Sequence, residues 1–494
     1  MDNKISPTAI KKRLVILGGG TAGWMAANLF AKELSEFFDI YVVESPEIGI
    51  VGVGEGSTPT LKRFFEMLNI AEFEWMAKCN ATYKTNIRFT GWSPQSGVSN
   101  YSHPFTTQVD VFTKKAFQVN CLTRRLGLNV NTKPEDFFLN GVLAKQNKQP
   151  VSPEHFPFKI EYGYHFDSYL LGQFLKEHAI KLGVTHLQQK VIDVEQTVSG
   201  DIAALLPEQG SKIIGGFFVD CTGFASLLMQ KTLNVGFKSF KDNLFNDSAV
   251  VVPSTMDDKA LVETQSIALS NGWAWKIPLT NRYGNGYVYS SDFISAEQAQ
   301  AELLNLVGES ANQDKIKHLK MRVGQLEAHW KNNCIALGLS QGFIEPLEAT
   351  ALHLVQVSIE LFIQHYKESE STQHQQNYNT KIKDRFERVR DYIVAHYKLN
   401  TRIDSEYWRA NQANMVLSES LRHILDVWFR RGDIEKEIER QQLQTHFNAQ
   451  SWHCLLSGYG AYPPLAKKQP ALGKGDLYLE ENIKSFLDRC ALNF

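Results

Sequence analysis

A glycine-rich turn near the start of the chain constrains the fold more than any other feature. Gly18, Gly20 and Gly23 follow the spacing G-x-G-x-x-G, between an apolar run and a segment with helical periodicity. Such glycines permit a tight turn, the close approach of a pyrophosphate and close packing of helix on strand. A second apolar run ends in Glu44, at the distance where an acid accepts a ribose hydroxyl. The pattern predicts a strand at 14–17, a helix at 24–37 and a strand at 40–44.

The same turn predicts a nucleotide ligand. Thr21 and Ala22 lie at the expected helix N-terminus, where unpaired N–H groups and the helix dipole favour phosphates. Asp220 lies in 217–223, an apolar run that ends in Asp-Cys-Thr-Gly. That ending resembles the strand-end motif of FAD enzymes with the glutathione-reductase-type nucleotide fold, which favours FAD over NAD. A turn or helix-capping role for Asp220 is the alternative.

Two more glycines are candidate cofactor contacts. Gly54 belongs to a second glycine-rich stretch, 52–59, which can offer backbone N–H groups to a planar ligand. An ordinary loop is the alternative for this stretch. Gly338 ends a further apolar run, 334–338, that we interpret as a strand leading into a loop.

Composition excludes several other classes of protein. The chain has 494 residues, and 52 basic side chains nearly balance 53 acidic ones, which argues against a nucleic-acid-binding protein. The 6 cysteines form no C-x-x-C pair, so neither a metal site nor a disulfide framework is predicted. No apolar stretch approaches the roughly 20 residues that a membrane helix needs. We expect no membrane partner and a cytoplasmic location.

The chain divides by pattern into two parts. Residues 1–350 are predicted to form a mixed α/β domain, with an excursion at about 95–155 where periodicity is weak. Residues 351–494 are mostly helical by apolar spacing. The predicted helices lie at 352–366, 381–396 and 407–429, and the polar run 368–379 is predicted to be a loop.

Three motifs beyond the glycine turn carry a family resemblance. Lys84 falls in Tyr-Lys-Thr-Asn-Ile-Arg-Phe, and Glu348 falls in Gly-Phe-Ile-Glu-Pro-Leu-Glu-Ala-Thr. Trp273 and Trp275 belong to Trp-Ala-Trp-Lys-Ile-Pro. Together with the glycine turn, these segments resemble the flavin-dependent halogenases of the tryptophan-halogenase-like group. The resemblance implies an α/β fold with an FAD-binding nucleotide domain of the glutathione-reductase type and an appended, mostly helical C-terminal region.

The resemblance also implies a reaction. Reduced FAD, oxygen and a chloride or bromide ion would give hypohalous acid, which an internal channel brings to Lys84. Lys84 would hydrogen-bond that species or form a haloamine, and Glu348 would orient it or take the ring proton. The paired tryptophans would form a wall that keeps the organic substrate from the flavin. Each motif alone has a simpler interpretation: an exposed lysine, a glutamate in a first helical turn, or tryptophans of the core.

The halide site is predicted at a helix start. The main-chain N–H groups of Thr350 and Ala351 match the family's halide-binding groups, and Pro346 stiffens the approach to them. Ala349 departs from the serine that most members have after the glutamate. Because the site uses the main chain, we expect halide binding to survive this change, with an altered halide preference.

The substrate side resembles the family less closely. His103 and Phe105 match the H-x-F of its aromatic pocket, and Pro346, Phe447, Trp273 and Trp275 are further pocket candidates. The groups that hold the amino-acid end of tryptophan are replaced. In an ungapped comparison with the tryptophan-specific members, those positions are occupied here by Glu435, Lys436, Gln442, His446, Phe447 and Ser451. The resemblance therefore implies indole, a substituted indole or another electron-rich aromatic as the substrate.

No NADH site is recognisable, so a separate NAD(P)H-dependent flavin reductase is the expected partner, beside a small aromatic substrate. A homodimer is left open. Two alternatives share part of the pattern. An FAD-dependent aromatic monooxygenase needs the nucleotide motifs but neither Lys84 nor the paired tryptophans, and a non-catalytic flavin-binding protein needs only the nucleotide motifs.

Overall fold

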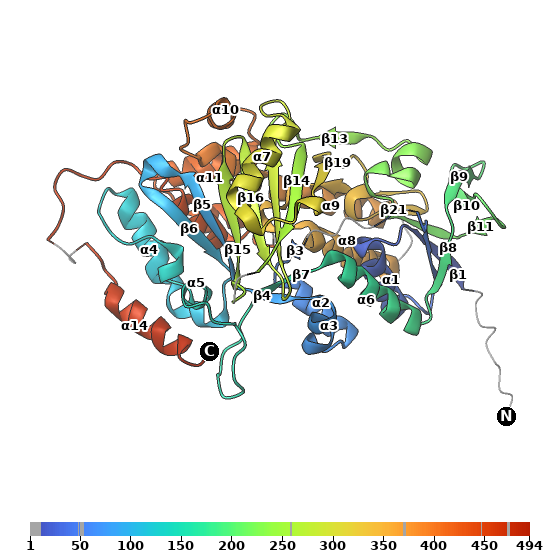
Figure 1. Cartoon of the computed structure of the whole chain (residues 1–494), viewed down its shortest axis with the longest axis horizontal. Coiled ribbons are helices and arrows are strands. Elements are labelled where there is room, and N and C mark those ends of the chain that lie inside the picture. The colour runs from blue at the N-terminus through green and yellow to red at the C-terminus, as the bar shows by residue number, and fades with distance from the viewer. Residues whose placement is uncertain are drawn as a thin grey trace.

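The computed structural model describes residues 11–47, 49, 54–256, 259–368, 372–445, 447–471 and 475–494. Figure 1 shows three regions along the molecule. A first sheet with its helices lies at the end that carries the N-terminus, a large sheet lies in the centre, and helices of the second half of the chain gather at the other end. The sequence's prediction of a mixed α/β fold with a helical C-terminal region agrees with this architecture.

The first sheet is built around the glycine turn. Its strands run in the order β20–β21–β12–β1–β2–β8, and β1 pairs in parallel with both β2 and β12. Parallel strands of this kind are covered on both faces, which explains the apolar run of β1. The strands are β1 (Lys12–Leu17), β2 (Phe38–Glu44), β8 (Thr185–Gln188), β12 (Phe217–Asp220), β20 (Trp330–Lys331) and β21 (Cys334–Ala336).

Helix α1 (Thr21–Glu33) begins three residues earlier than the predicted 24–37 and also ends earlier. The difference at the start arises because Gly20 itself is the N-cap, so the helix begins directly after the turn. Helices α6 (Ser168–Lys181) and α8 (Ala351–Glu368) both pack against α1. A segment that begins at residue 351 therefore covers the first sheet.

The central sheet has seven strands in the order β18–β14–β17–β16–β15–β5–β6. β5 carries the second half of the Lys84 motif, and β16 carries both tryptophans of the tryptophan motif. Its members are β5 (Asn86–Ser93), β6 (Val98–Pro104), β14 (Ser248–Ser254), β15 (Glu263–Leu269), β16 (Gly272–Pro278), β17 (Tyr283–Tyr289) and β18 (Lys317–Lys320). Because β6 pairs with β5, the start of the 95–155 excursion is part of this sheet.

Three smaller sheets complete the strands. One joins β3 (Glu55–Gly56), β7 (Gly163–Phe166) and β4 (Thr82–Lys84), and it places Lys84 at the end of a strand. The second contains β9 (Val191–Gln196), β10 (Ile202–Pro207) and β11 (Ile213–Ile214). The third contains β13 (Phe237–Ser239), β19 (Gly324–Leu326) and β22 (Gly342–Phe343).

The remaining helices of the first part cover these sheets. α2 (Thr60–Leu68) packs against α8 and β7, and α3 (Glu72–Lys78) packs against α6. α7 (Ala296–Val307) covers β14 and β17. The excursion at 95–155 contains α4 (Lys114–Arg125) and α5 (Leu139–Lys145), so it is more regular than its weak periodicity predicts.

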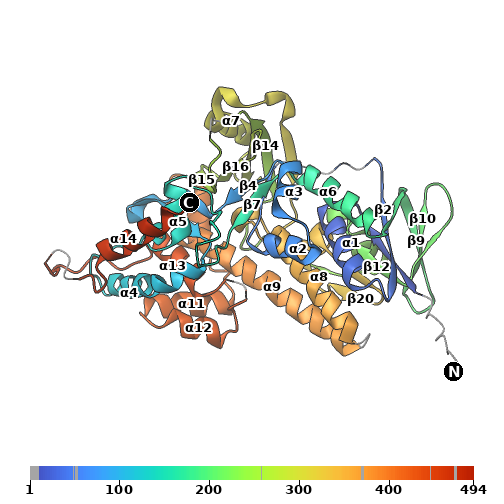
Figure 2. The ribbon, with the colours of Figure 1, turned by 90° about the horizontal axis from the view of Figure 1, so that it is seen from below.

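The second part is helical, with two corrections to the prediction. Residues 372–379, predicted to be a loop, open the long helix α9 (Thr372–Leu399). The tertiary reason is that Asn379 hydrogen-bonds the main chain of Trp330 while Tyr378, Ile382 and Phe386 are buried. Figure 2 shows α9 running from beside α8 toward the C-terminal helices.

The predicted helix 407–429 is two helices, α10 (Glu406–Ala413) and α11 (Glu419–Phe429). Lys398 donates hydrogen bonds to the carbonyls of Gln412 and Asn414, and the side chain of Ser418 caps α11. These contacts stabilise a break that apolar spacing does not reveal. The chain ends with α12 (Ile434–Arg440), α13 (Ala449–Gly458) and α14 (Glu480–Ala491), the last of which packs against α5.

One core cluster extends from Leu14 to Ala491 and draws side chains from both parts of the chain. The division of the chain at residue 350 stays a prediction. Among the residues that the structure describes, no helix is long and apolar enough to cross a membrane.

Candidate functional site

The glycine turn has the geometry that a dinucleotide needs. Gly18 has a φ of +116°, and a Cβ there would lie 2.2 Å from the carbonyl oxygen of Cys221, so only glycine fits. A Cβ on Gly23 would lie 2.1 Å from the carbonyl oxygen of Gly18. By contrast, nothing lies within 4 Å of the corresponding point at Gly20. The turn is therefore packed on the strand side and open where a phosphate would approach.

The first turn of α1 carries no acidic side chain. Gly20 is its N-cap without a side-chain cap, and the first turn, which begins with Thr21 and Ala22, holds no acidic residue. Its unpaired N–H groups remain for a diphosphate. Gly338 also lies here, since its Cβ would come within 2.8 Å of Ala22.

Glu44 and Asp220 are both engaged with protein groups. The Glu44 carboxylate lies over Gly19, and one of its oxygens is 2.7 Å from Nζ of Lys176. Asp220 is fully buried and accepts hydrogen bonds from the main chain of Thr222, Leu228 and Met229. Asp220 therefore holds the turn after β12, which is the structural alternative that the sequence left open. Direct contact of either acid with a cofactor stays a prediction.

Residues 54–59 of the second glycine-rich stretch are described, whereas Gly52 and Val53 lie outside the described residues. The φ of Gly54, +83°, favours glycine, and the nearest neighbours of a Cβ placed there belong to the turn between β16 and β17 and to the start of β17. This stretch therefore approaches the sheet that carries the tryptophan motif.

Lys84 is a fully buried residue whose amine lies beside Gly56. A Cβ placed on Gly56 would lie 3.1 Å from Nζ of Lys84, 3.5 Å from Oγ1 of Thr264 and 3.7 Å from Cβ of Ala349. The ring of Phe105 is 5.5 Å from Nζ. Among the described residues, Nζ has no hydrogen-bond partner. The interpretation of Lys84 as an ordinary exposed lysine is therefore wrong.

Burial lowers the pKa of Lys84 from 10.5 to about 7, although the charge of Glu348 opposes the shift. A substantial share of Lys84 is thus neutral near pH 7 and can act as a hydrogen-bond acceptor or nucleophile. His165 lies nearby, with Nε2 2.9 Å from Oγ1 of Thr264. Burial, reinforced by Lys84, holds the pKa of His165 well below its usual range.

Glu348 is a buried carboxylate clamped between two histidines. Nδ1 of His103, on β6, lies 3.0 Å from one oxygen, and Nε2 of His396, on α9, lies 3.0 Å from the other. His396 is held in turn by the hydroxyl of Tyr459, 3.0 Å from its Nδ1. Burial alone would raise the pKa of Glu348, but His103 and His396 lower it to about 2. Glu348 is therefore a fixed negative charge.

A tight turn links Glu348 to α8. Pro346 opens the 3-10 turn η9 (Pro346–Glu348), and Ala349 follows in the left-handed region with a φ of +55°. The carbonyl of Thr350 accepts the first bond of α8, from Leu354. Among the described residues, no acceptor faces the main-chain N–H groups of Thr350 and Ala351, and the buried Thr350 hydroxyl also has no partner. These donors match the needs of a small anion.

Trp273 and Trp275 lie on one face of β16, because side chains alternate along a strand, and their ring centroids are 6.0 Å apart. A Cβ on Gly286 of β17 would lie 2.1 Å from the Trp275 ring, so this glycine makes room for the indole. Trp92 lies 6.5 Å from Trp273 and 6.1 Å from His396. The tryptophan pair is thus connected through aromatic rings to the Glu348 clamp.

The aromatic pocket candidates separate into two groups. Phe105 lies beside Lys84, whereas His103 contacts Glu348 and the Tyr392–Phe447 pair. The rings of Tyr392 and Phe447 stack at 3.7 Å. The structure therefore brings Phe105 to Lys84, and it brings His103, with Phe447 next to it, to Glu348.

Most of the candidate positions for the amino-acid end of a substrate are exposed. Glu435, Lys436 and Gln442 are all exposed, and Ser451 is half-buried. The carbonyl of Ser451 accepts a hydrogen bond from Tyr392. His446 lies outside the described residues.

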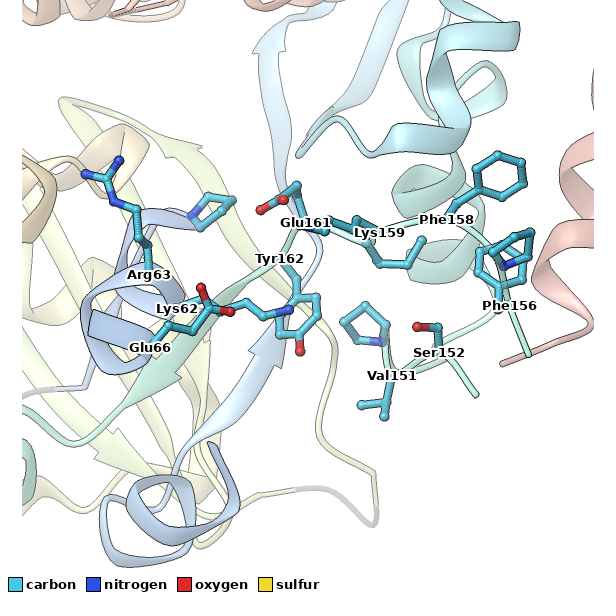
Figure 3. Close-up of a pocket in the computed structure, with 14 residues that line it drawn as sticks. Lys62, Arg63, Glu66, Val151, Ser152, Phe156, Phe158, Lys159, Glu161 and Tyr162 are labelled. Carbon is cyan, nitrogen blue, oxygen red and sulfur yellow. The ribbon is translucent and has the colours of Figure 1, made fainter. Parts of the chain in front are cut away.

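A cleft of about 540 Å³ lies between α2 and the segment 150–162 (Figure 3). Lys62 and Glu66 come from the helix, and Phe156 and Phe158 come from the opposing segment. Neither Lys84 nor Glu348 lines it. We therefore locate the candidate site by its buried polar groups and not by this cleft.

Comparison with known proteins bears directly on this geometry. A family model described as tryptophan halogenase matches residues 13–472. The chain belongs to the tryptophan halogenase family. The tryptophan 6-halogenase SttH of Streptomyces toxytricini is 36% identical over 84% of this chain and 83% of its own length. The 7-chloro-L-tryptophan 6-halogenase KtzR of Kutzneria sp. is 34% identical over 91% of this chain and 90% of its own.

Solved structures show the same fold. The crystal structure of SttH matches with a TM-score of 0.84 at 31% identity, covering 98% of this chain and 97% of that one. A flavin-dependent halogenase from Xanthomonas campestris matches with a TM-score of 0.82 at 32% identity, covering 98% and 95%. The protein is thus a flavin-dependent halogenase, which confirms the predicted family and fold and disfavours the monooxygenase alternative.

Several residues of the halogenase site were not singled out from the sequence. They are Trp92, His165, His396 and Tyr459. His396 had one available signal, because it lies one helical turn after Tyr392 on the buried face of a predicted helix. The others carry no local pattern that separates them from core residues.

Proposed function

We propose that this halogenase uses reduced FAD, oxygen and chloride or bromide to make hypohalous acid, and that it halogenates an electron-rich aromatic, indole or a substituted indole. The observation that carries the proposal is the buried amine of Lys84, which has no hydrogen-bond partner among the described residues and lies near Ala349, the residue that follows Glu348. A buried amine without a partner is costly, so a functional reason for it is required.

The cofactor would be held at the glycine turn. The diphosphate of FAD fits against Gly20 and the uncapped start of α1, with Thr21, Ala22 and Gly23 in the first turn. Glu44, Gly54, Asp220 and Gly338 complete the proposed set. When bound, reduced FAD supplies the electrons that convert oxygen and halide into hypohalous acid. Thr350 and Ala351 would hold the halide through their N–H groups.

The protein's own groups then confine and aim the halogen. Neutral Lys84 hydrogen-bonds hypohalous acid or forms a haloamine with it, and the pKa of about 7 keeps both routes open. With a pKa of about 2, Glu348 is a weak base, which favours orientation of the halogenating species over removal of the ring proton. Trp273 and Trp275 would separate the aromatic substrate from the flavin.

Aromatic rings would hold the substrate. Phe105, His103 and Phe447 surround the Lys84–Glu348 region, and Pro346 borders it through its turn. The exposed positions of Glu435, Lys436 and Gln442 support a substrate without a bound amino-acid end. We therefore place indole ahead of free tryptophan, which is the named substrate of the relatives.

The test is halogenation by the purified protein with FAD, bromide or chloride, NADH and a separate flavin reductase, followed by mass spectrometry of an indole panel. Wild type should give a mono-brominated indole. Lys84→Met should lower product formation at least a hundredfold while FAD affinity stays unchanged. Lys78→Met is the matched control, because Lys78 ends α3 on the surface.

Three outcomes would contradict parts of this proposal. Retained halogenation in Lys84→Met removes Lys84 from the mechanism. Hydroxylated product without bromination indicates a monooxygenase. Faster turnover of tryptophan than of indole overturns the substrate assignment and leaves the halogenase assignment intact.

A further inference from the structure

A compact cluster of two histidines and a glutamate joins the end of α8 to the start of α9. His365 and Glu368 belong to the last turn of α8, and His374 belongs to the first turn of α9. The two Nδ1 atoms lie 3.0 Å apart. An oxygen of Glu368 lies 3.3 Å from Nδ1 of His374 and 3.6 Å from Nδ1 of His365.

These three separations have the size of the edges of a metal coordination tetrahedron. Zn²⁺ binds imidazole nitrogen and carboxylate oxygen at about 2.0–2.2 Å, which puts neighbouring ligand atoms about 3.3 Å apart in a tetrahedral site. Hydrogen bonding among the three groups explains the geometry less well. One imidazole can donate to the other, but 3.3 and 3.6 Å to the carboxylate are long for charge-assisted bonds.

A neighbouring side chain orients the carboxylate of the cluster. The second carboxylate oxygen of Glu368 accepts a hydrogen bond from Gln364 at 3.2 Å, which leaves the first oxygen facing the histidines. His365 is buried, and Nδ1 is the ring nitrogen that faces the cluster. A polar group that holds a ligating carboxylate is the usual second layer of a metal site.

We propose that His365, Glu368 and His374 form a binding site for a divalent transition-metal ion, with zinc as the ion that fits best. Two imidazoles and a carboxylate are ligands that zinc accepts, and the fourth position would be held by water. The ion would link the ends of the two long helices, so its effect is expected on stability.

The site is separate from the halogenation chemistry. α8 extends from Ala351, at the proposed halide turn, to Glu368, and 18 helical residues span about 27 Å. The metal proposal therefore stands or falls independently of the halide and FAD assignments.

The experiment uses the full chain after treatment with a chelator and gel filtration. Zinc is added, unbound metal is removed, and zinc per chain is measured by mass spectrometry, together with zinc affinity and the change in Tm on adding zinc. Wild type should retain one zinc ion per chain and should gain Tm, and the chelator should reverse both.

Three variants decide the outcome. Glu368→Gln and His374→Gln remove one ligand each and should weaken zinc binding roughly tenfold or more. His423→Gln is the matched control, because His423 and Glu419 form an exposed histidine–glutamate pair, 4.0 Å apart, on α11. It should bind zinc like wild type.

Equal zinc binding by wild type and Glu368→Gln would overturn the proposal, because it would place the ion at other groups such as the free cysteines. Absence of zinc binding by wild type would overturn it as well. Since the Glu368 side chain is half exposed, Glu368→Gln should fold even if His374→Gln does not.

Discussion

At the scale of single residues, Lys84 combines a stability cost with a chemical use. Its amine is fully buried and its pKa falls from 10.5 to about 7, so folding disfavours the charged form. The cost is fully present well below pH 7, where the amine is protonated in both the folded and the unfolded state, and most of it remains at pH 7. It declines as pH rises from about 7 to 10.5, because the folded protein then no longer carries the proton that the unfolded chain still holds.

We therefore predict that Lys84→Met increases the free energy of unfolding at pH 7, by roughly 2–5 kcal/mol. The gain should shrink toward pH 10, where the wild-type amine is neutral in the fold. Denaturant unfolding at pH 7 and pH 9.5 measures both values. Lys78→Met should show no such pH dependence, because Lys78 is exposed. A gain for Lys84→Met that is equal at both pH values would show that the amine is not desolvated.

The environment of Glu348 favours the charged form, whereas that of Lys84 disfavours it. Its carboxylate is as deeply buried as Lys84, yet His103 and His396 lower its pKa to about 2. A buried charge that is hydrogen-bonded on both oxygens is fixed in place, whereas an unpartnered amine can change its protonation state. This difference separates the roles that we assign to the two residues.

At the scale of elements, the turn from η9 into α8 sets the proposed halide site. Ala349 adopts a left-handed φ of +55°, which turns the chain so that α8 starts at Ala351. Because the site uses main-chain donors, the alanine at 349 in place of the family's usual serine removes no N–H group from it.

The turn allows a single N–H group to be removed cleanly. Ala351 is the first residue of α8, and proline is well tolerated at that helix position. We predict that Ala351→Pro raises the KM for bromide at least tenfold, while the fold and FAD affinity are kept. Steady-state halogenation at varied bromide concentration measures this.

Ala296→Pro is the matched control, since Ala296 is the first residue of α7 and lies after the N-cap Ser295. It makes the same chemical change at the same helix position on the outer face of the central sheet. An unchanged KM for bromide in Ala351→Pro would exclude this N–H group from the halide site.

At the scale of the whole molecule, the helical second part completes the site of the first. His396 of α9 holds Glu348, and α8 covers α1 of the nucleotide fold. The main core cluster is shared between the two parts. Such shared packing couples the unfolding of both parts.

We predict one cooperative thermal transition for the protein without added flavin, with calorimetric and van't Hoff enthalpies that agree. Differential scanning calorimetry measures both. The scan is made without FAD because a bound ligand would itself raise stability. Two resolved transitions, with proteolytic cleavage near residue 350 between them, would show instead that the predicted two-part division is also a division in folding.

The sequence already predicted the nucleotide fold and most of the candidate site. The reason is local: a glycine at a φ of +116°, an apolar strand and an uncapped helix start leave a pattern within a few neighbouring residues. The Lys84, Glu348 and tryptophan motifs are also short, so each of them can be recognised within a few neighbouring residues. Family membership therefore followed from segments that can be recognised one at a time.

Tertiary structure alone decided what surrounds those segments. His103 and His396 reach Glu348 from a strand and a helix that are far apart in sequence, and the contacts of Asn379 and Ser418 decide where helices begin and break. Burial decided the charge states, because desolvation and hydrogen bonding depend on the packing of distant elements and not on neighbouring residues. The chain's local pattern thus determined which groups are present, and its packing determined which of them meet.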